Sequence, residues 1–130
     1  MKLAVVSDIH SNIEAFEAVL ADAFALGVDQ IVSLGDNIGY GGDPETVVRL
    51  MGQHKIESVM GNHELALMDG GYLEKFNPRA RKALLINKNL ISRESMDQIR
   101  LFQPFMVRFG LRFVHGLPPD SVTTYISKVS

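Results

Sequence analysis

Residues 3–10 read LAVVSDIH, an aliphatic run that ends in a polar stretch with an aspartate and a histidine. A continuous run such as Leu3–Val6 is typical of a strand that is buried on both faces of a parallel sheet. A helical pattern follows it, and Gln30–Leu34 has the pattern of a second strand. The order strand, helix, strand predicts a right-handed parallel crossover. The chain is therefore expected to be an α/β protein.

Capping residues predict where the helices begin and end. Ser11-Asn12-Ile13-Glu14 has the pattern of a capping box with Ser11 as the N-cap. The helix that follows is expected to end near Gly27 and to bury one face, made of Ile13, Phe16, Leu20, Ala23 and Phe24. The other expected elements are a helix from Asp43-Pro44 to about Gly52, a strand Ile56–Met60, a short helix broken by Gly70-Gly71, a helix from Asn77-Pro78 to about Leu90, a helix capped by Ser95 and ended by Pro104, and a hairpin of Phe105–Phe109 and Leu111–His115.

A polar cluster follows each predicted buried strand. The four clusters are Asp8-Ile9-His10, Gly35-Asp36-Asn37, Gly61-Asn62-His63-Glu64 and Val114-His115-Gly116. The carboxyl ends of parallel strands lie at one edge of a sheet, so these side chains are expected to converge on a single crevice. Carboxylate, amide and imidazole groups are good ligands for divalent metals such as Mn²⁺, Fe and Zn²⁺. The chain has no cysteine, which excludes a thiolate metal site.

The ligand types suggest a centre with two divalent metal ions. Asp8 and His10 are expected to bind the first ion, and Asp36 is expected to bridge it to the second. Asn62 and His115 are the expected ligands of the second ion. Two cations about 3.5–4 Å apart activate a bridging water and neutralise a phosphoryl group during in-line attack.

Further residues of the clusters have expected roles in catalysis and binding. His63 is expected to protonate the leaving oxygen, and Glu64 to hold the His63 ring and favour its charged form. Tyr40 and Gly41 belong to a glycine-rich loop that can contact a substrate, although Tyr40 can equally pack over its own glycines.

In combination, these clusters resemble the motifs of the calcineurin-like metallophosphoesterase superfamily. The stretch from Asp36 to Gly41, followed by Asp43-Pro44, is similar to a bacterial branch of phosphodiesterases and phosphatases. The resemblance extends from Leu3 to about Tyr125 and implies a four-layer α/β/β/α sandwich in a single domain, residues 1–130. The resemblance also implies that Asp8, His10, Asp36, Asn62 and His115 bind the two metal ions and that His63 is the general acid. These are the roles that the residue types in the clusters already suggest.

The last motif of that family, Gly-His-x-His, is missing. Only residues 116–130 follow His115, and none of them is histidine. The domain is therefore expected to be C-terminally incomplete at the end of its second sheet, with each metal site one ligand short. Three alternatives stay open: a working phosphoesterase, a truncated and weak or inactive member that binds a phosphorylated ligand or a partner, and a fragment that acts with a missing segment.

Composition excludes several other classes of protein. A chain of 130 residues with 46% hydrophobic and 22% charged residues is typical of one globular domain. The net charge of -2 gives no electrostatic attraction toward nucleic acid, so nucleic acid is not expected as a partner, and no stretch resembles a signal peptide or a membrane helix. The expected location is cytoplasmic. The expected substrates are phosphorylated small molecules, nucleotides or phosphoproteins.

Two segments have more than one interpretation. Five basic residues between Arg79 and Arg93 can attract an anionic substrate, but they fit better as the solvated face of a helix. Ser121–Ile126 is rich in β-prone residues, and an incomplete sheet edge favours pairing with another copy of the chain. We therefore expect a homo-oligomer through that edge.

Overall fold

A three-stranded parallel sheet lies at the centre of the fold, and the computed structural model describes residues 1–125. The strands are arranged in the order β1 (Leu3–Val6), β2 (Gln30–Ser33) and β3 (Glu57–Ser58). An antiparallel hairpin forms a second sheet from β4 (Phe105–Arg108) and β5 (Leu111–Val114). The expected α/β fold with a parallel sheet is confirmed.

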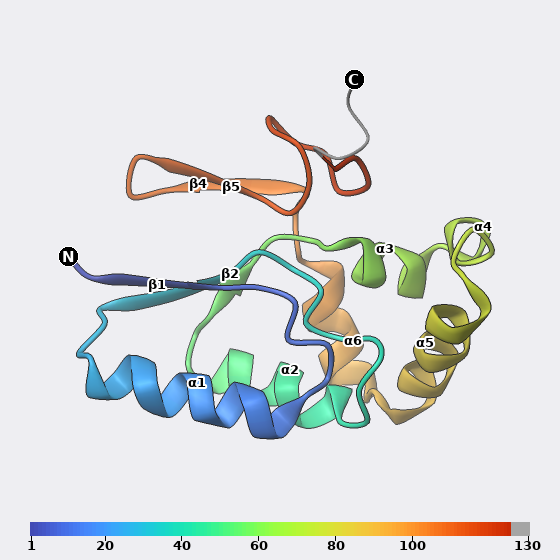
Figure 1. Cartoon of the computed structure of the whole chain (residues 1–130), viewed down its shortest axis with the longest axis horizontal. Coiled ribbons are helices and arrows are strands. Elements are labelled where there is room, and N and C mark those ends of the chain that lie inside the picture. The colour runs from blue at the N-terminus through green and yellow to red at the C-terminus, as the bar shows by residue number, and fades with distance from the viewer. Residues whose placement is uncertain (126–130) are drawn as a thin grey trace.

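Six helices accompany the strands within the described residues. They are α1 (Ile13–Ala25), α2 (Pro44–Gln53), α3 (Asn62–Met68), α4 (Gly70–Leu73), α5 (Pro78–Leu90) and α6 (Arg93–Arg100). Figure 1 shows α1 and α2 along one face of the parallel sheet and the hairpin on the opposite face. Helices α3, α4 and α5 lie beyond the carboxyl ends of the strands (Figure 1). None of the helices in residues 1–125 is long and apolar enough to cross a membrane.

Two apolar clusters hold these layers together. The larger cluster lies between the sheet and the helices, and it includes Phe16 of α1, Met51 of α2 and Ile99 of α6. The smaller cluster joins the other face of the sheet to the hairpin through Val32 and Phe113. Burial of one such side chain contributes about 1.5–3 kcal/mol, so the larger cluster dominates the stability of the domain.

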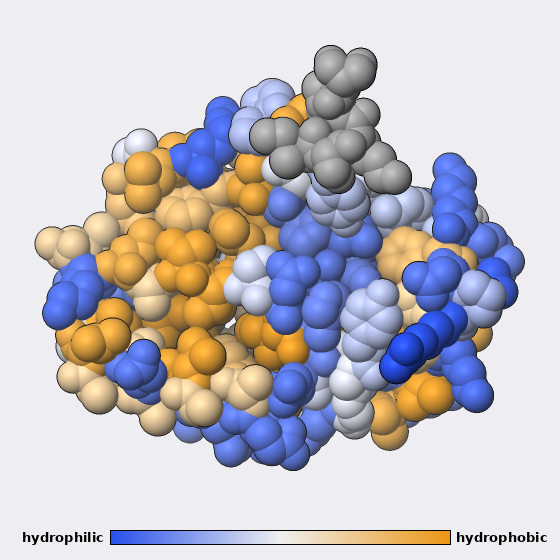
Figure 2. Space-filling view, in the orientation of Figure 1, coloured by the Kyte–Doolittle hydropathy of each residue, from blue (hydrophilic) through white to orange (hydrophobic). Residues whose placement is uncertain are grey.

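The residues described contain three of the four layers that the family resemblance implies. Helices, the parallel sheet and the hairpin follow one another, and no helix among residues 1–125 covers the outer face of the hairpin (Figure 1). Phe105 and Val107 of the hairpin are accordingly 38% and 50% exposed. Figure 2 shows a broad apolar surface on the side of β1 and the hairpin, next to a hydrophilic band.

Two details of α1 differ from the prediction. The N-cap is Asn12 rather than Ser11, because Asn12 Oδ1 accepts a hydrogen bond from the Ala15 N–H at 3.1 Å. Ser11 is buried and its hydroxyl bonds elsewhere. Phe24 is 50% exposed instead of buried, since it lies at the edge of the apolar face beside His54.

The later elements show further corrections. Helix α6 is capped by Ser92 rather than Ser95. Gly70-Gly71 opens α4 after α3 has ended at Met68. The third strand is shorter than expected, because Val59 forms only an isolated bridge with Gln103. In the predicted β-prone tail, residues 121–125 form no strand but fold back on residues 116–117, and Ile126 lies outside the described residues.

Candidate metal centre

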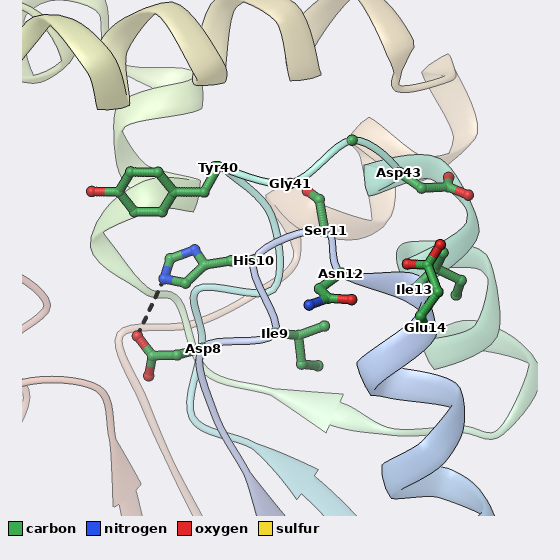
Figure 3. A pocket seen from close by; sticks show the side chains of 11 residues that line it. Asp8, Ile9, His10, Ser11, Asn12, Ile13, Glu14, Tyr40, Gly41 and Asp43 are labelled. Carbon is green, nitrogen blue, oxygen red and sulfur yellow. Dashed lines mark ion pairs between the residues drawn. The ribbon is translucent and has the colours of Figure 1, made fainter.

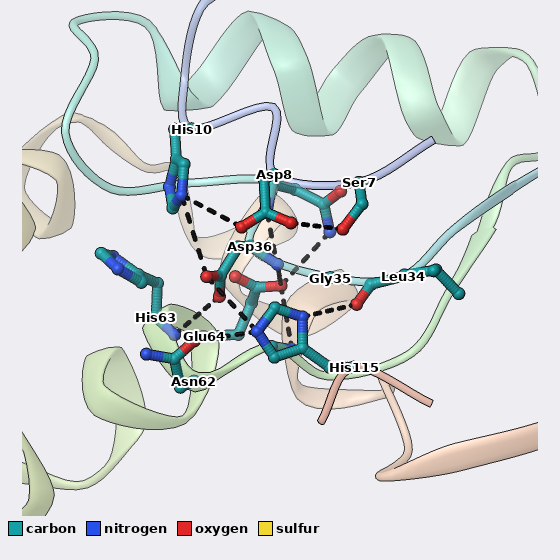
Figure 4. A network of polar contacts seen from close by, with 12 residues as sticks. Ser7, Asp8, His10, Leu34, Gly35, Asp36, Asn62, His63, Glu64 and His115 are labelled. Carbon is teal, nitrogen blue, oxygen red and sulfur yellow. Dashed lines mark hydrogen bonds and ion pairs between the residues drawn. The ribbon is translucent and has the colours of Figure 1, made fainter. Parts of the chain in front are cut away.

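The five predicted metal ligands lie together at the carboxyl edge of the parallel sheet (Figure 4). They come from four separate segments, which are the loop after β1 with Asp8 and His10, the loop after β2 with Asp36, the first turn of α3 with Asn62, and the end of β5 with His115. The sheet and the hairpin therefore bring Asp8 and His115 together, although these residues are 107 positions apart in the chain (115 minus 8).

Three of these residues have a backbone conformation that is uncommon for side chains other than glycine. The φ angles of Asp8, His10 and Asp36 are 58°, 50° and 57°. Bonds between the two loops hold this conformation: the Asp8 N–H donates to Gly35 O and the His10 N–H donates to Asp36 O, both at 3.0 Å. Strained backbone of this kind occurs often at functional sites, where the surrounding structure fixes it.

Asp36 is the residue that the other ligands share. Its Oδ2 lies 3.8 Å from His10 Nε2 and 3.5 Å from His115 Nε2. Two groups of possible ligand atoms form around it, one with His10 and His63 and the other with Asp8 and His115. This grouping differs from the predicted one, in which Asp8 and His10 share an ion, although His10 Nε2 also lies 3.5 Å from Asp8 Oδ1.

Backbone carbonyls orient the two histidine rings that face Asp36. His10 Nδ1 lies 3.0 Å from Ile38 O, and His115 Nδ1 lies 2.8 Å from Leu34 O. A carbonyl can only accept, so each contact requires the proton on Nδ1 and leaves the lone pair of Nε2 directed at Asp36. Histidines that bind metals in proteins are usually oriented in this way.

The environment of Asp36 favours a cation. Asp36 is only 4% exposed, and this burial raises the pKa of its carboxyl group, an effect that His115 and the His63 N–H only partly offset. The His63 N–H donates to Asp36 Oδ1 at 2.9 Å. Gly61 allows this close approach, because a Cβ at that position would lie 2.2 Å from Asp36 Oδ1. A buried carboxylate with two imidazoles directed at it fits a divalent metal well.

Asn62 lies between His115 and Asp36. One end of its side-chain amide is 2.9 Å from His115 Nε2, and the same end lies within hydrogen-bond distance of both Asp36 oxygens. With the nitrogen at this end the amide donates to these acceptors, and with the oxygen there it is a metal ligand. A half-turn of the amide exchanges the two, so Asn62 is compatible with the predicted role.

His63 and Glu64 do not form the predicted pair. No hydrogen bond joins them within residues 1–125, and His63 Nδ1 is buried without a partner there. Burial, reinforced by His10, lowers the pKa of His63 to about 4, so Glu64 does not keep this ring charged. The expectation that Glu64 orients His63 was wrong.

Glu64 instead anchors the backbone under the metal ligands. Its Oε1 accepts from the Asp36 N–H at 2.8 Å, the Gly61 N–H at 3.3 Å and Asn37 Nδ2 at 3.3 Å. Burial raises the pKa of Glu64 to about 8. Glu64 is 0% exposed, and its hydrogen bonds join the loops after β2 and β3.

Tyr40 and Gly41 line a pocket of about 600 Å³ beside His10. Figure 3 shows Tyr40 on the same side of the pocket as the His10 ring, and the two ring centroids lie 5.0 Å apart. The rest of the lining comes from residues 8–14 and from residues 42–43. Both predicted substrate-binding residues therefore lie at the rim of the metal centre, and Tyr40 is 51% exposed.

Sequence reasoning missed Asn87, a buried residue of α5. Its Oδ1 accepts from the Ser11 hydroxyl at 2.6 Å and from the Gly39 N–H at 2.8 Å, and its Nδ2 donates to Gly41 O at 3.0 Å. Asn87 thus joins the loop that carries His10 to the loop that carries Tyr40. Its one local signal was an asparagine on the buried side of a helix, where an unpartnered amide would be costly.

Comparison with known proteins identifies the family of the chain. The family profile "Calcineurin-like phosphoesterase" matches residues 1–128. The chain is 40% identical over 94 residues to the uncharacterised protein MJ0912 of Methanocaldococcus jannaschii, which covers 72% of this chain and 39% of that protein. It is 36% identical over 66 residues to serine/threonine-protein phosphatase 2 of Escherichia coli, covering 50% of this chain and 30% of that protein.

A solved structure agrees over almost the whole chain. The crystal structure of a metallophosphoesterase from Sphaerobacter thermophilus superimposes with a TM-score of 0.80 at 37% sequence identity, and the match covers 97% of this chain and 51% of that one. The chain thus spans about half the length of this relative and less than half of the curated ones. Profile, sequence and structure agree that this chain belongs to the calcineurin-like phosphoesterase family.

Proposed function

We propose that this chain hydrolyses phosphate mono- or diesters with the help of two divalent metal ions, with Mn²⁺, Fe and Zn²⁺ as the ions that suit its ligands. The observation that carries the proposal is the shared carboxylate of Asp36, toward which both His10 Nε2 and His115 Nε2 are directed. Two imidazole nitrogens directed at one carboxylate oxygen fit a bridging role for Asp36.

The proposed ligands divide into two sets around Asp36. Asp8 and His10 would hold the first ion, and Asn62 and His115 the second. When bound, such ions supply an activated water for in-line attack and neutralise charge on the phosphoryl group. The carbonyls of Ile38 and Leu34 support this assignment, because they fix the two histidine rings before any ion binds.

His63 is the proposed general acid. Its ring centroid lies 4.6 Å from that of His10, so it flanks the centre without being needed as a ligand. An anionic phosphoryl group next to the ring favours the protonated imidazole and counters the effect of burial on its pKa. His63 would then donate this proton to the leaving oxygen, while Glu64 holds the backbone of Asp36 and Gly61 in place.

The proposed substrates are phosphorylated small molecules, nucleotides or phosphoproteins. The name of the Escherichia coli relative, a serine/threonine-protein phosphatase, supports the last class. Tyr40 and Gly41 are the proposed substrate contacts, because both line the open pocket beside His10.

The test is hydrolysis of bis-p-nitrophenyl phosphate and p-nitrophenyl phosphate by protein stripped of metal and then supplied with Mn²⁺. Turnover should require Mn²⁺, and His63→Ala should lower kcat by about 10²–10⁴-fold, the usual contribution of a general acid. His54→Ala is the matched control, because His54 is exposed and lies outside the metal centre. Binding of phosphate without any turnover would favour the alternative of a member that only binds phosphorylated ligands.

The four-layer α/β/β/α sandwich that the resemblance implies and the homo-oligomer also stay proposals. The hairpin of β4 and β5 has only two strands within residues 1–125, and its outer face is partly exposed. Exposed strand edges favour pairing with another copy of the chain. Gel filtration at micromolar concentration tests this, and a monomer would contradict it.

A further inference from the structure

A second pocket of about 440 Å³ shares Tyr40 with the pocket beside His10 and is lined by residues of α4 and α5. Its walls include His63 together with the rings of Tyr40, Tyr72 and Phe76. The volume lies in the range of roughly 300–1,000 Å³ that is typical of sites for small organic ligands. Figure 1 shows that α4 and α5 lie next to α3, whose first turn carries His63.

The rings form one continuous aromatic cluster around His63. The ring centroids of Phe76 and His63 lie 5.1 Å apart, those of Tyr40 and His63 5.0 Å apart, and those of Tyr72 and Phe76 5.2 Å apart. All three pairs are tilted or edge-to-face. An added planar group can pack against such a cluster, since aromatic groups bind one another in offset-stacked or edge-to-face geometry.

The charges of the two pockets differ. The pocket beside His10 is lined by the carboxylates of Asp8, Glu14 and Asp43. The aromatic pocket has Lys75 among its lining residues and no carboxylate from the described part of the chain. Lys75 therefore makes the aromatic pocket the more favourable of the two for a leaving group that is uncharged or carries a further negative charge, whereas Glu14 and Asp43 disfavour an anionic leaving group in the other pocket.

The position of His63 indicates which part of the substrate lies in the aromatic pocket. His63 lines the aromatic pocket but not the acidic one. A general acid must be within hydrogen-bond distance of the oxygen that it protonates. Accordingly, and resting on the proposed function, we propose that the aromatic pocket binds the leaving group of the substrate and selects leaving groups that carry a planar aromatic or heteroaromatic ring.

Tyr72 and Phe76 are therefore specificity-determining residues. Neither belongs to the predicted metal ligands or to the proposed acid, so their substitution should alter substrate preference without removing the catalytic groups. Each contact between two aromatic groups strengthens binding by a factor of about 2–10, beyond the effect of the buried area alone. Lys75 at the same pocket would attract a further anionic group on the leaving side.

The experiment compares 2-phenylethyl phosphate with 2-cyclohexylethyl phosphate in the presence of Mn²⁺. The leaving alcohols have almost equal acidity and length, so the ratio of the two kcat/KM values measures the preference for a flat ring. We expect a ratio of about 5 or more for the wild type and a fall toward 1 for Phe76→Leu and Tyr72→Leu. Phe24→Leu, at an exposed aromatic of α1, should keep the wild-type ratio.

A binding measurement separates this inference from the proposed function. The probes are 2-phenylethylphosphonate and 2-cyclohexylethylphosphonate with Zn²⁺, and the readout is the NMR shift of the Tyr72 and Phe76 ring protons. Ring-dependent shifts without turnover of either ester would support the pocket and contradict the hydrolase. Turnover with equal kcat/KM values would support the hydrolase and overturn the pocket. If the phosphonates cause no shift at these rings, the inference is wrong whatever the activity.

Discussion

The Ser11 hydroxyl donates a hydrogen bond of 2.6 Å to Asn87 Oδ1, although 76 positions separate the two residues. The same oxygen also accepts from the Gly39 N–H, and the other end of the amide donates to Gly41 O. A single side chain of α5 thus joins the two loops on which His10 and Tyr40 lie. This contact explains why Ser11 does not cap α1.

Asn87→Ala should destabilise the domain and loosen both loops. The substitution leaves the Gly39 N–H and the Ser11 hydroxyl without their acceptor, and each buried unpaired group costs about 1–3 kcal/mol. We expect a loss of about 2–4 kcal/mol in the free energy of unfolding, measured with urea. Asn89→Ala makes the same change at an exposed position of α5 and should cost less than about 0.5 kcal/mol. Equal losses in both variants would contradict the role of Asn87.

The convergence of the proposed metal ligands could be predicted from sequence because a simple rule places these residues at one edge of the sheet. Asp8, Asp36 and Asn62 each follow a strand of one parallel sheet, and the carboxyl ends of such strands lie at the same edge. Asn87 could not be predicted, because its partners lie in loops far away in the chain. The role of Glu64 was also missed, since local sequence places it beside His63 while tertiary contacts direct it to backbone N–H groups.

The residue at which a helix begins is also difficult to predict from local sequence alone. The sequence predicted Ser95 as the cap of α6, because serine is a favoured N-cap residue, but this preference does not fix the position. The structure selects Ser92, whose hydroxyl accepts from the Ser95 N–H at 3.1 Å while its own N–H donates to Glu45 of α2 at 3.0 Å. This partner lies 47 positions away, so only the packing of α2 against α6 identifies the cap. The strands, by contrast, were located to within a few residues because buried aliphatic runs are a strong local signal.

Gly39→Ala should displace His63. A Cβ at position 39 would lie 2.3 Å from His63 Nδ1, and the φ of +91° is itself unfavourable for alanine. We expect the variant to lose most of its Mn²⁺-dependent hydrolysis of p-nitrophenyl phosphate while it keeps its fold, as judged by circular dichroism.

Gly42→Ala provides the control for that variant, because a Cβ at position 42 meets no atom within 4 Å. It lies in the same loop, and its activity should stay close to that of the wild type. Full activity in Gly39→Ala would show that the position of the His63 ring does not matter for catalysis.

The contribution of Glu45 to stability should depend on pH. Burial alone would raise the pKa of Glu45, but hydrogen bonds from Ser95 and Ser92 outweigh it and lower the pKa below its ordinary value. A carboxyl group with a lowered pKa in the folded state stabilises the protein above the pKa of the unfolded state, and this stabilisation is lost as the pH falls through the folded-state pKa. The difference in Tm between the wild type and Glu45→Gln should therefore be largest near neutral pH and shrink below about pH 4.5.

Glu94→Gln is the matched control for this titration. Glu94 lies in the first turn of α6 and is exposed, so it shares the favourable helix dipole but not the hydrogen bonds that Glu45 receives. Its effect on Tm should be small at every pH. A Tm difference for Glu45→Gln that does not change between pH 7 and pH 3 would show that the hydrogen bonds do not require the charged form.

Two variants of Glu64 distinguish the effect of its carboxyl group on stability from the effect of its hydrogen-bond acceptor. Glu64→Ala removes the acceptor of the Asp36 N–H and the Gly61 N–H, and two buried unpaired donors should cost about 2–4 kcal/mol in the free energy of unfolding. Glu64→Gln keeps a carbonyl oxygen at the same place, and its amide nitrogen takes the position of Oε2, which has no hydrogen-bond partner within the described residues. The Gln variant should therefore retain most of the stability that the Ala variant loses. Urea unfolding of the two variants beside the wild type measures this, and equal losses would mean that the carboxyl group, rather than its accepting oxygen, holds the loops after β2 and β3.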